Sequence, residues 1–119
     1  MPAERFPTEI KLHQKSRVLE IAFSDGRQFR FPFEFLRVYS PSAEVRGHGP
    51  GQEVLQTGKS EVDNRALEPV GSYAVQPAFS DGHNTGIYSW DYLYELGENQ
   101  DALWQAYLEM LTAAGVSRD

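Results

Sequence analysis

Residues 19–31, Leu-Glu-Ile-Ala-Phe-Ser-Asp-Gly-Arg-Gln-Phe-Arg-Phe, decide the fold of this chain. Apolar side chains occupy every second position from Leu19 to Phe23, which is typical of a strand with one buried face. The central Asp-Gly pair predicts a tight turn, because glycine adopts a positive φ without steric cost. The apolar alternation resumes after this pair, so the stretch predicts a β-hairpin.

A five-residue part of this stretch occurs twice in the chain. Residues 22–26, Ala-Phe-Ser-Asp-Gly, are identical to residues 78–82. Both copies follow an alternating segment and precede aromatic residues and a helical pattern, so we expect one turn chemistry to be used twice. Further strands are predicted at residues 10–12, 66–70 and 73–79.

The remaining segments predict helices and one long loop. A short helix is expected over residues 32–37, where proline suits the first position. A second helix is expected over residues 89–97, with Ser89 as its cap. An apolar stripe predicts a third helix over residues 98–115. The Gly, Pro and Ser content of residues 40–60 predicts an irregular loop.

Together these elements predict an α+β fold. We expect a small antiparallel β-sheet built from two hairpin units, with helices packed on it and the C-terminal helix longest. A length of 119 residues fits a single domain, 1–119, with its own core. The absence of cysteine excludes thiolate catalysis, disulfides and iron–sulfur ligation by this chain.

The charge of the chain is distributed unevenly. Eleven basic residues stand against 17 acidic ones, a net charge of −6, and residues 61–119 contain two basic residues against ten acidic ones. Such an acidic half argues against nucleic acid, which proteins bind by neutralising phosphates. It is either a solvated face or a patch that attracts a basic partner protein.

The sequence also bears on location. No apolar run approaches the ~20 residues that cross a bilayer, and the N-terminal residues lack the layout of a secretory signal. We therefore expect a cytoplasmic protein that does not insert into membranes.

Complete catalytic motifs are missing. Residues 57–60, Thr-Gly-Lys-Ser, match the end of a phosphate-binding loop, but the position of its first glycine is Glu53, whose charge repels phosphate. A Gly-x-Ser-x-Gly elbow for a serine nucleophile does not occur. We therefore expect no catalytic residues and no enzyme activity.

The residues with chemistry closest to a metal site are His48, Asp81 and His83. Both histidines are expected in loops and would meet Asp81 if the long loop folds onto the second turn. Because no histidine pair has the spacing of metal ligands, we expect no bound metal and no cofactor. A small metal-binding protein or enzyme that uses these three residues remains the alternative.

Aromatic residues are dense just before the last helix. We predict an interaction surface for a protein partner, because too many aromatics alternate here to be buried on one helix face. Burial in the core is the alternative for each residue, and an exposed strip would also permit a homodimer. The residues of this predicted surface are Tyr88, Trp90, Tyr92, Tyr94 and Glu95.

Four segments share the pattern of a known family. They are residues 23–37, ending in Phe-Leu-Arg, Gly-His-Gly-Pro-Gly at 47–51, Glu-Pro-Val-Gly-x-Tyr-Ala at 68–74, and Phe-x-Asp-Gly-His-x-x-Gly-Ile-Tyr-x-Trp at 79–90. Over residues 8–97 the chain resembles the gamma-butyrobetaine hydroxylase-like N-terminal domain family, as a stand-alone bacterial member of unknown function. Similar domains stand at the front of carnitine-synthesis hydroxylases and behind P-loop ATPases that carry iron–sulfur clusters. Neither chemistry resides in the domain itself.

The resemblance also bears on metal. In the hydroxylases the equivalent domain holds a structural zinc with three cysteines and a histidine, and these positions correspond to Ser40, Ser42, Val45 and His83. Three of the four ligands are therefore missing, so we do not expect zinc binding. The resemblance implies an accessory or adaptor module that binds a protein and is linked to iron–sulfur or metalloprotein maturation.

Overall fold

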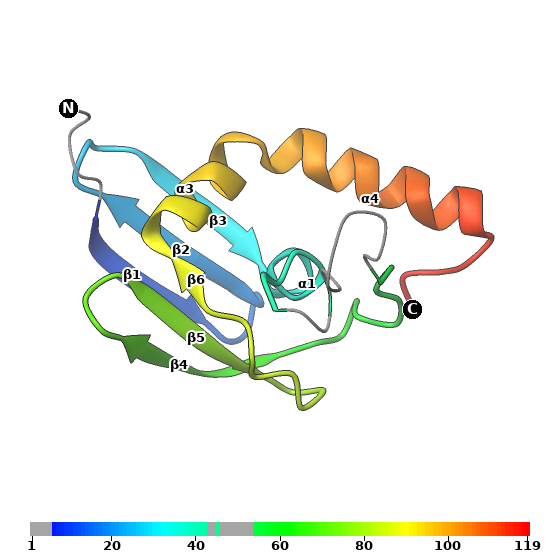
Figure 1. Cartoon of the computed structure of the whole chain (residues 1–119), viewed down its shortest axis with the longest axis horizontal. Helices are drawn as coiled ribbons and strands as arrows, with labels where there is room; N and C mark the ends of the chain where they lie inside the picture. The colour runs from blue at the N-terminus through cyan, green and yellow to red at the C-terminus, as the bar shows by residue number, and fades with distance from the viewer. Residues whose placement is uncertain (1–5, 43–44, 46–53) are drawn as a thin grey trace.

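The structure is a computed structural model that describes residues 6–42, 45 and 54–119 (Figure 1). The strands are β1 Pro7–His13, β2 Val18–Phe23, β3 Gln28–Pro32, β4 Asn64–Val70, β5 Ala74–Phe79 and β6 Tyr88–Ser89. The helices among these residues are α1 Phe33–Val38, α3 Trp90–Glu98 and α4 Gln100–Ala114. The predicted α+β class is confirmed, with the C-terminal helix longest.

The strands form two sheets instead of the single sheet that we predicted. Their orders are β1-β2-β3 and β4-β5-β6, and all pairs are antiparallel. Strands that follow one another in the chain pair with one another, and each set of three leads directly into a helix, α1 or α3. The chain therefore contains two successive units of three strands and a helix, which Figure 1 shows side by side.

The two copies of Ala-Phe-Ser-Asp-Gly fold in the same way. In the first copy, Asp25 Oδ1 accepts a hydrogen bond from the Arg27 amide at 3.0 Å. In the second, Asp81 Oδ1 accepts one from the His83 amide at 3.1 Å. The glycine of each turn has a positive φ, 88° and 89°, which favours glycine over other residues. The prediction that one turn chemistry is used twice is confirmed.

One core joins the two units. Both sheets, α1 and α3 contribute to it, so neither unit buries its apolar face alone. The end of α3 lies so close to the first sheet that a Cβ at Gly97 would come within 2.5 Å of the Phe29 ring. The largest fully buried apolar side chains of this core are Leu19, Ile21, Phe23, Phe31, Phe33, Phe35, Leu36, Tyr88 and Leu93.

Helix α4 is held less tightly than the other elements. It begins inside the predicted range 98–115 and ends at Gly115, whose φ is 68°. Only Tyr107 and Leu111 of its apolar stripe are buried, against Val38 of α1, whereas Met110 is 47% exposed. The helix extends past the strands (Figure 1), and Met110 on its apolar stripe is accessible to solvent.

Two further expectations concern loops and membranes. Of the predicted loop over residues 40–60, residues 40–42 and 54–60 contain neither helix nor strand, whereas Val45 has helical backbone. Within the described residues, each helix is too short or too polar to cross a bilayer.

The residues after α4 fasten the helix to the body. Arg118 donates two hydrogen bonds to the carboxylate of Glu34 in α1, from Nε at 3.0 Å and from Nη2 at 2.6 Å. The same guanidinium lies 5.3 Å from the ring centre of Trp104 in α4. Glu34 is buried, so this bidentate pair supplies the charge that its carboxylate needs.

Replacing Arg118→Ala should lower the free energy of unfolding by about 1–3 kcal/mol, because it leaves the buried Glu34 carboxylate without its charged donor. Urea denaturation followed by circular dichroism measures this loss. Arg30→Ala removes an exposed arginine 3.7 Å from Glu20 and should change little. Equal losses of stability in the two variants would contradict a stabilising role for the Arg118–Glu34 pair.

Candidate functional site

The carboxylate of Asp81 lies between two cations. Its Oδ2 accepts hydrogen bonds from Arg37 Nε at 2.8 Å and from Lys59 Nζ at 2.6 Å. Burial by itself would raise the pKa of Asp81, but the bonds from Lys59, from the His83 amide and from Arg37 lower it to about 2. Asp81 is therefore ionised at neutral pH and joins its turn to α1 and to the segment before β4.

The imidazole of His83 points to a serine. His83 Nε2 and Ser40 Oγ share a hydrogen bond of 2.8 Å, and both residues are buried. Gly86 makes this approach feasible, because a Cβ there would overlap Ser40 Oγ. The predicted site is therefore split: Asp81 meets the backbone of His83, whereas the His83 ring is turned to Ser40. The third predicted residue, His48, lies outside the described residues.

The four positions that correspond to zinc ligands do come together in space. Beside the Ser40–His83 pair, Ser42 Oγ and Thr85 Oγ1 share a hydrogen bond of 2.7 Å, and Val45 is buried. These residues do not fit zinc, because valine has no donor atom and two neutral hydroxyls replace thiolates. Hydrogen bonds connect the two segments instead. Across the described part of the chain, no group of three or more His, Asp or Glu side chains is arranged to hold a metal ion.

The predicted aromatic surface is wrong for two of its five residues. Tyr88 is fully buried, and Tyr94 is also in the core, where its hydroxyl donates to Asp25 Oδ2 at 2.6 Å. Trp90 and Tyr92 are half-buried, and Glu95 is exposed. The five residues therefore do not form one exposed strip.

The aromatic residues in this region tie elements together through their polar atoms. The Tyr88 hydroxyl donates to the Leu36 carbonyl, and burial raises the pKa of Tyr88. Trp90 Nε1 donates to the carbonyl of Ser72 at 2.8 Å. Buried tyrosine and tryptophan need such partners, and backbone carbonyls at element ends supply them. Tyr88 and Trp90 thus contribute to packing within the fold.

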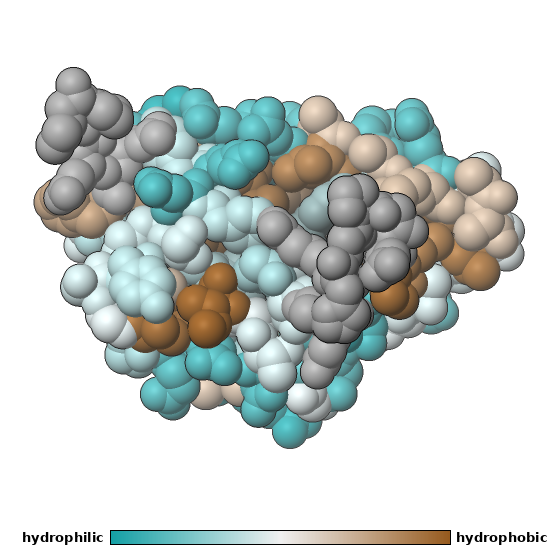
Figure 2. All heavy atoms as spheres, in the orientation of Figure 1, coloured by the Kyte–Doolittle hydropathy of each residue, from teal (hydrophilic) through white to brown (hydrophobic). Residues whose placement is uncertain are grey.

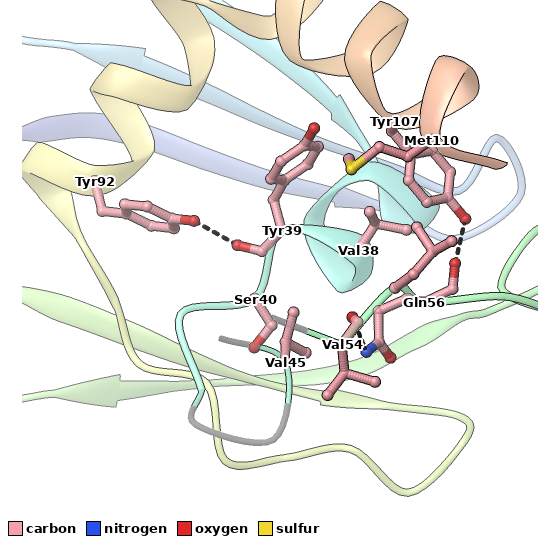
Figure 3. Close-up of a pocket in the computed structure, with 10 residues that line it drawn as sticks. Val38, Tyr39, Ser40, Val45, Val54, Gln56, Tyr92, Tyr107 and Met110 are labelled. Atoms are coloured by element: carbon pink, nitrogen blue, oxygen red, sulfur yellow. Dashed lines mark hydrogen bonds between the residues drawn. The ribbon is translucent and has the colours of Figure 1, made fainter. Parts of the chain in front are cut away.

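The tyrosines around α4 follow the same principle. Tyr92 donates to the Tyr39 carbonyl at 2.5 Å, and the Tyr39 hydroxyl donates to the Leu103 carbonyl at 2.6 Å. Tyr107 donates to the Gln56 carbonyl at 2.7 Å. These bonds hold α3, the end of α1, α4 and the segment after residue 53 around a common space (Figure 3).

That space consists of two neighbouring hollows that share Tyr39 and Tyr92, and we call them together the α4 groove. Each hollow has a volume of about 420 Å³. Figure 3 shows the first of them, with Met110 directed toward it from α4. The described residues that line the groove are Val38, Tyr39, Ser40, Val45, Val54, Leu55, Gln56, Tyr92, Glu95, Leu96, Asn99, Ala102, Leu103, Tyr107 and Met110.

The sequence pattern identified this groove only in part, because Tyr92 and Glu95 of the predicted surface line it. It assigned the α4 stripe to the core, and the stripe does bury Tyr107, but Met110 stays accessible. A usable signal was the apolar pair Val54-Leu55 within an otherwise polar loop. Val54 is 54% exposed at the rim of the groove.

Replacing Asp81→Asn should lower the free energy of unfolding at neutral pH by about 1–3 kcal/mol, because it removes a charge-assisted acceptor for two cations. Because the pKa of Asp81 is lower in the folded protein, its ionised carboxylate stabilises the fold above the unfolded-state pKa of about 4. This stabilisation is lost as the pH falls toward the folded-state pKa of about 2. The difference between the two proteins should therefore shrink over that interval in urea titrations. The exposed Asp91→Asn variant serves as the control, and a difference independent of pH would argue against the proposed charge state.

Replacing Ser40→Ala should lower the free energy of unfolding by about 1–3 kcal/mol, since His83 Nε2 loses its buried partner. The ¹⁵N shifts of the His83 ring, read by NMR, should change in the same variant. Ser16→Ala, at an exposed turn position, should alter neither quantity. An unchanged His83 ring would mean that Ser40 does not contact it in solution.

Comparison with known proteins gives a consistent picture. A protein solved by NMR is 48% identical over 98% of this chain and 92% of its own, with a TM-score of 0.85. A second NMR structure is 53% identical over 99% of this chain and 89% of its own, with a TM-score of 0.81. A crystal structure from Acidithiobacillus ferrooxidans, of a DUF971-family protein with unknown function, is 45% identical over 76% of this chain and 91% of its own, with a TM-score of 0.65.

Among curated proteins, none matches the chain significantly. A family model does match, the one described as gamma-butyrobetaine hydroxylase-like, N-terminal, and it covers residues 10–94. The four sequence segments that carried the resemblance overlap this match, and the fold agrees with the solved structures. The chain belongs to the family of gamma-butyrobetaine hydroxylase-like N-terminal domains.

Proposed function

We propose that this protein is a non-catalytic accessory module of the cytoplasm that acts by binding another protein in the α4 groove. The observation that carries the proposal is an apolar hollow that described residues of α4 and of the body line, with Met110 and Val54 about half exposed. Apolar side chains grouped at a concave surface commonly mark binding sites. The apolar surface that runs along α4 in Figure 2 is consistent with this role.

The polar residues support binding over catalysis. Asp81 already accepts hydrogen bonds from two cations, and His83 Nε2 is paired with Ser40. Each group thus has a structural contact that a catalytic role would have to break. The same contacts weigh against a metal-binding protein or enzyme built on His48, Asp81 and His83.

The family supplies the biological setting of the proposal. Domains that resemble this one follow P-loop ATPases that carry iron–sulfur clusters, and a fused domain commonly works with its neighbour. We therefore place the protein in iron–sulfur or metalloprotein maturation, as a part that recruits or positions a partner. A homodimer through the same groove is the competing assembly.

A photoreactive amino acid at position 110 tests the proposal in the native host. Met110→p-benzoylphenylalanine should give a discrete adduct with a partner protein, whereas the same replacement at Tyr73, which is 57% exposed between β4 and β5, should not. Adding Val54→Asp at the groove rim should abolish the adduct, because a charge there opposes apolar contact. Mass spectrometry of the adduct identifies the partner.

Three results would contradict the proposal. They are adducts that form equally at positions 73 and 110, adducts that survive Val54→Asp, and an adduct with twice the mass of this chain. The last would assign the groove to a homodimer.

A further inference from the structure

We infer that the partner segment in the α4 groove is an amphipathic helix that carries Lys or Arg beside its apolar side chains. The inference rests on the proposed function and names the chemical class of the partner. Two properties of the groove support it, its dimensions along α4 and the sign of the charge around it.

The dimensions suit a short helix. The residues that α4 contributes run from Asn99 through Ala102 and Leu103 to Tyr107 and Met110, a spacing of three or four that keeps them on one face. At 1.5 Å per residue this face is about 16 Å long, or three helical turns. An apolar groove beside a helix is a common receptor for a second helix, which inserts side chains at positions i, i+3 or i+4, and i+7.

The charged side chains of α3 and α4 have a single sign. Helices α3 and α4 contain five acidic residues and no Lys, Arg or His. Of these five, only Glu98 forms an ion pair with another described residue, Arg27, at 3.7 Å. The other four are exposed and make no ion pair with the described residues: Asp91, Glu95, Asp101 and Glu109.

Two of these carboxylates are placed to act on an occupant. Glu95 lines the groove itself, and Glu109 follows the groove residue Ala102 by seven residues, or two turns, which puts Ala102 and Glu109 on the same side of α4. The described lining residues include no cation that would neutralise them. Apolar contact would supply most of the affinity, while the carboxylates at the rim would select a basic helix over an acidic one and speed its association.

Two synthetic helices of about 18 residues test the inference, a length at which isolated helices begin to be stable in water. Both have the same leucine face, and their polar faces consist of lysine in one and glutamate in the other. The intact protein, labelled with ¹⁵N, is titrated with each peptide. The Leu/Lys peptide should bind about tenfold more tightly, with shift changes centred on Tyr39, Leu103 and Met110.

Charge reversal at the rim provides the matched variant. In Glu95→Lys/Glu109→Lys the preference should invert, so that the Leu/Glu peptide binds more tightly. Glu9→Lys/Glu68→Lys changes the net charge by the same amount at exposed strand positions and should keep the original preference. Heat denaturation confirms that both variants are folded before the titration.

Each outcome decides one question. Equal binding of both peptides, no binding of either, or shift changes away from the groove would overturn the inference. If the adduct at position 110 persists while the Leu/Lys peptide fails to bind, the partner is of another class and the proposed function stands. If the shifts at these residues change on dilution of the protein alone, the occupant is a second copy of the chain.

Discussion

The structure depends on the hydrogen bonds that the aspartate of each Ser-Asp-Gly turn accepts with its two carboxylate oxygens. One oxygen closes the turn by accepting an amide of its own loop, and the other accepts a side chain from the helix of the opposite unit. Asp25, in the first unit, is bound by Tyr94 of α3, and Asp81, in the second, is bound by Arg37 of α1. Each turn therefore holds the other unit's helix, and because the contacts are reciprocal, neither unit can keep its geometry without the other. This constraint explains why two small sheets of three strands share one core.

Hydrogen bonds from aromatic side chains extend this framework to the last helix. Tyr88 and Tyr92 fasten the start of α3 to the end of α1, and Tyr39 and Tyr107 connect α4 to the segments beneath it. Each donates to a backbone carbonyl, which gives the hydroxyl the hydrogen-bond acceptor that it needs away from water. Because these contacts link the helices at separated points, they leave space between them. The α4 groove is the space between the elements that these tyrosine hydrogen bonds connect.

The polar cluster at the second turn shows how a family fold can keep its shape with different chemistry. Of the positions that the family resemblance matches to zinc ligands, Ser40 and His83 share a hydrogen bond, Ser42 bonds Thr85, and the Val45 amide donates to the Ser42 carbonyl. These side-chain hydrogen bonds connect the loop after α1 to the second turn and its following residues. The polar side chains of this cluster are thus engaged within the fold, whereas Glu95 and Met110 on α3 and α4 are exposed.

The sequence by itself determined the local structure: the paired Asp-Gly turns, the strands on either side of them, the cap at Ser89 and the end of α4 at Gly115. These features depend on φ preferences, alternation and capping, which act over a few neighbouring residues. The family was likewise recognisable from short motifs. Only the tertiary structure decided that there are two sheets, that Tyr88 and Tyr94 are buried, and that the open surface lies along α4. These outcomes depend on contacts between residues far apart in the chain. A tyrosine has the same local pattern whether its hydroxyl meets water or a carbonyl more than fifty residues away.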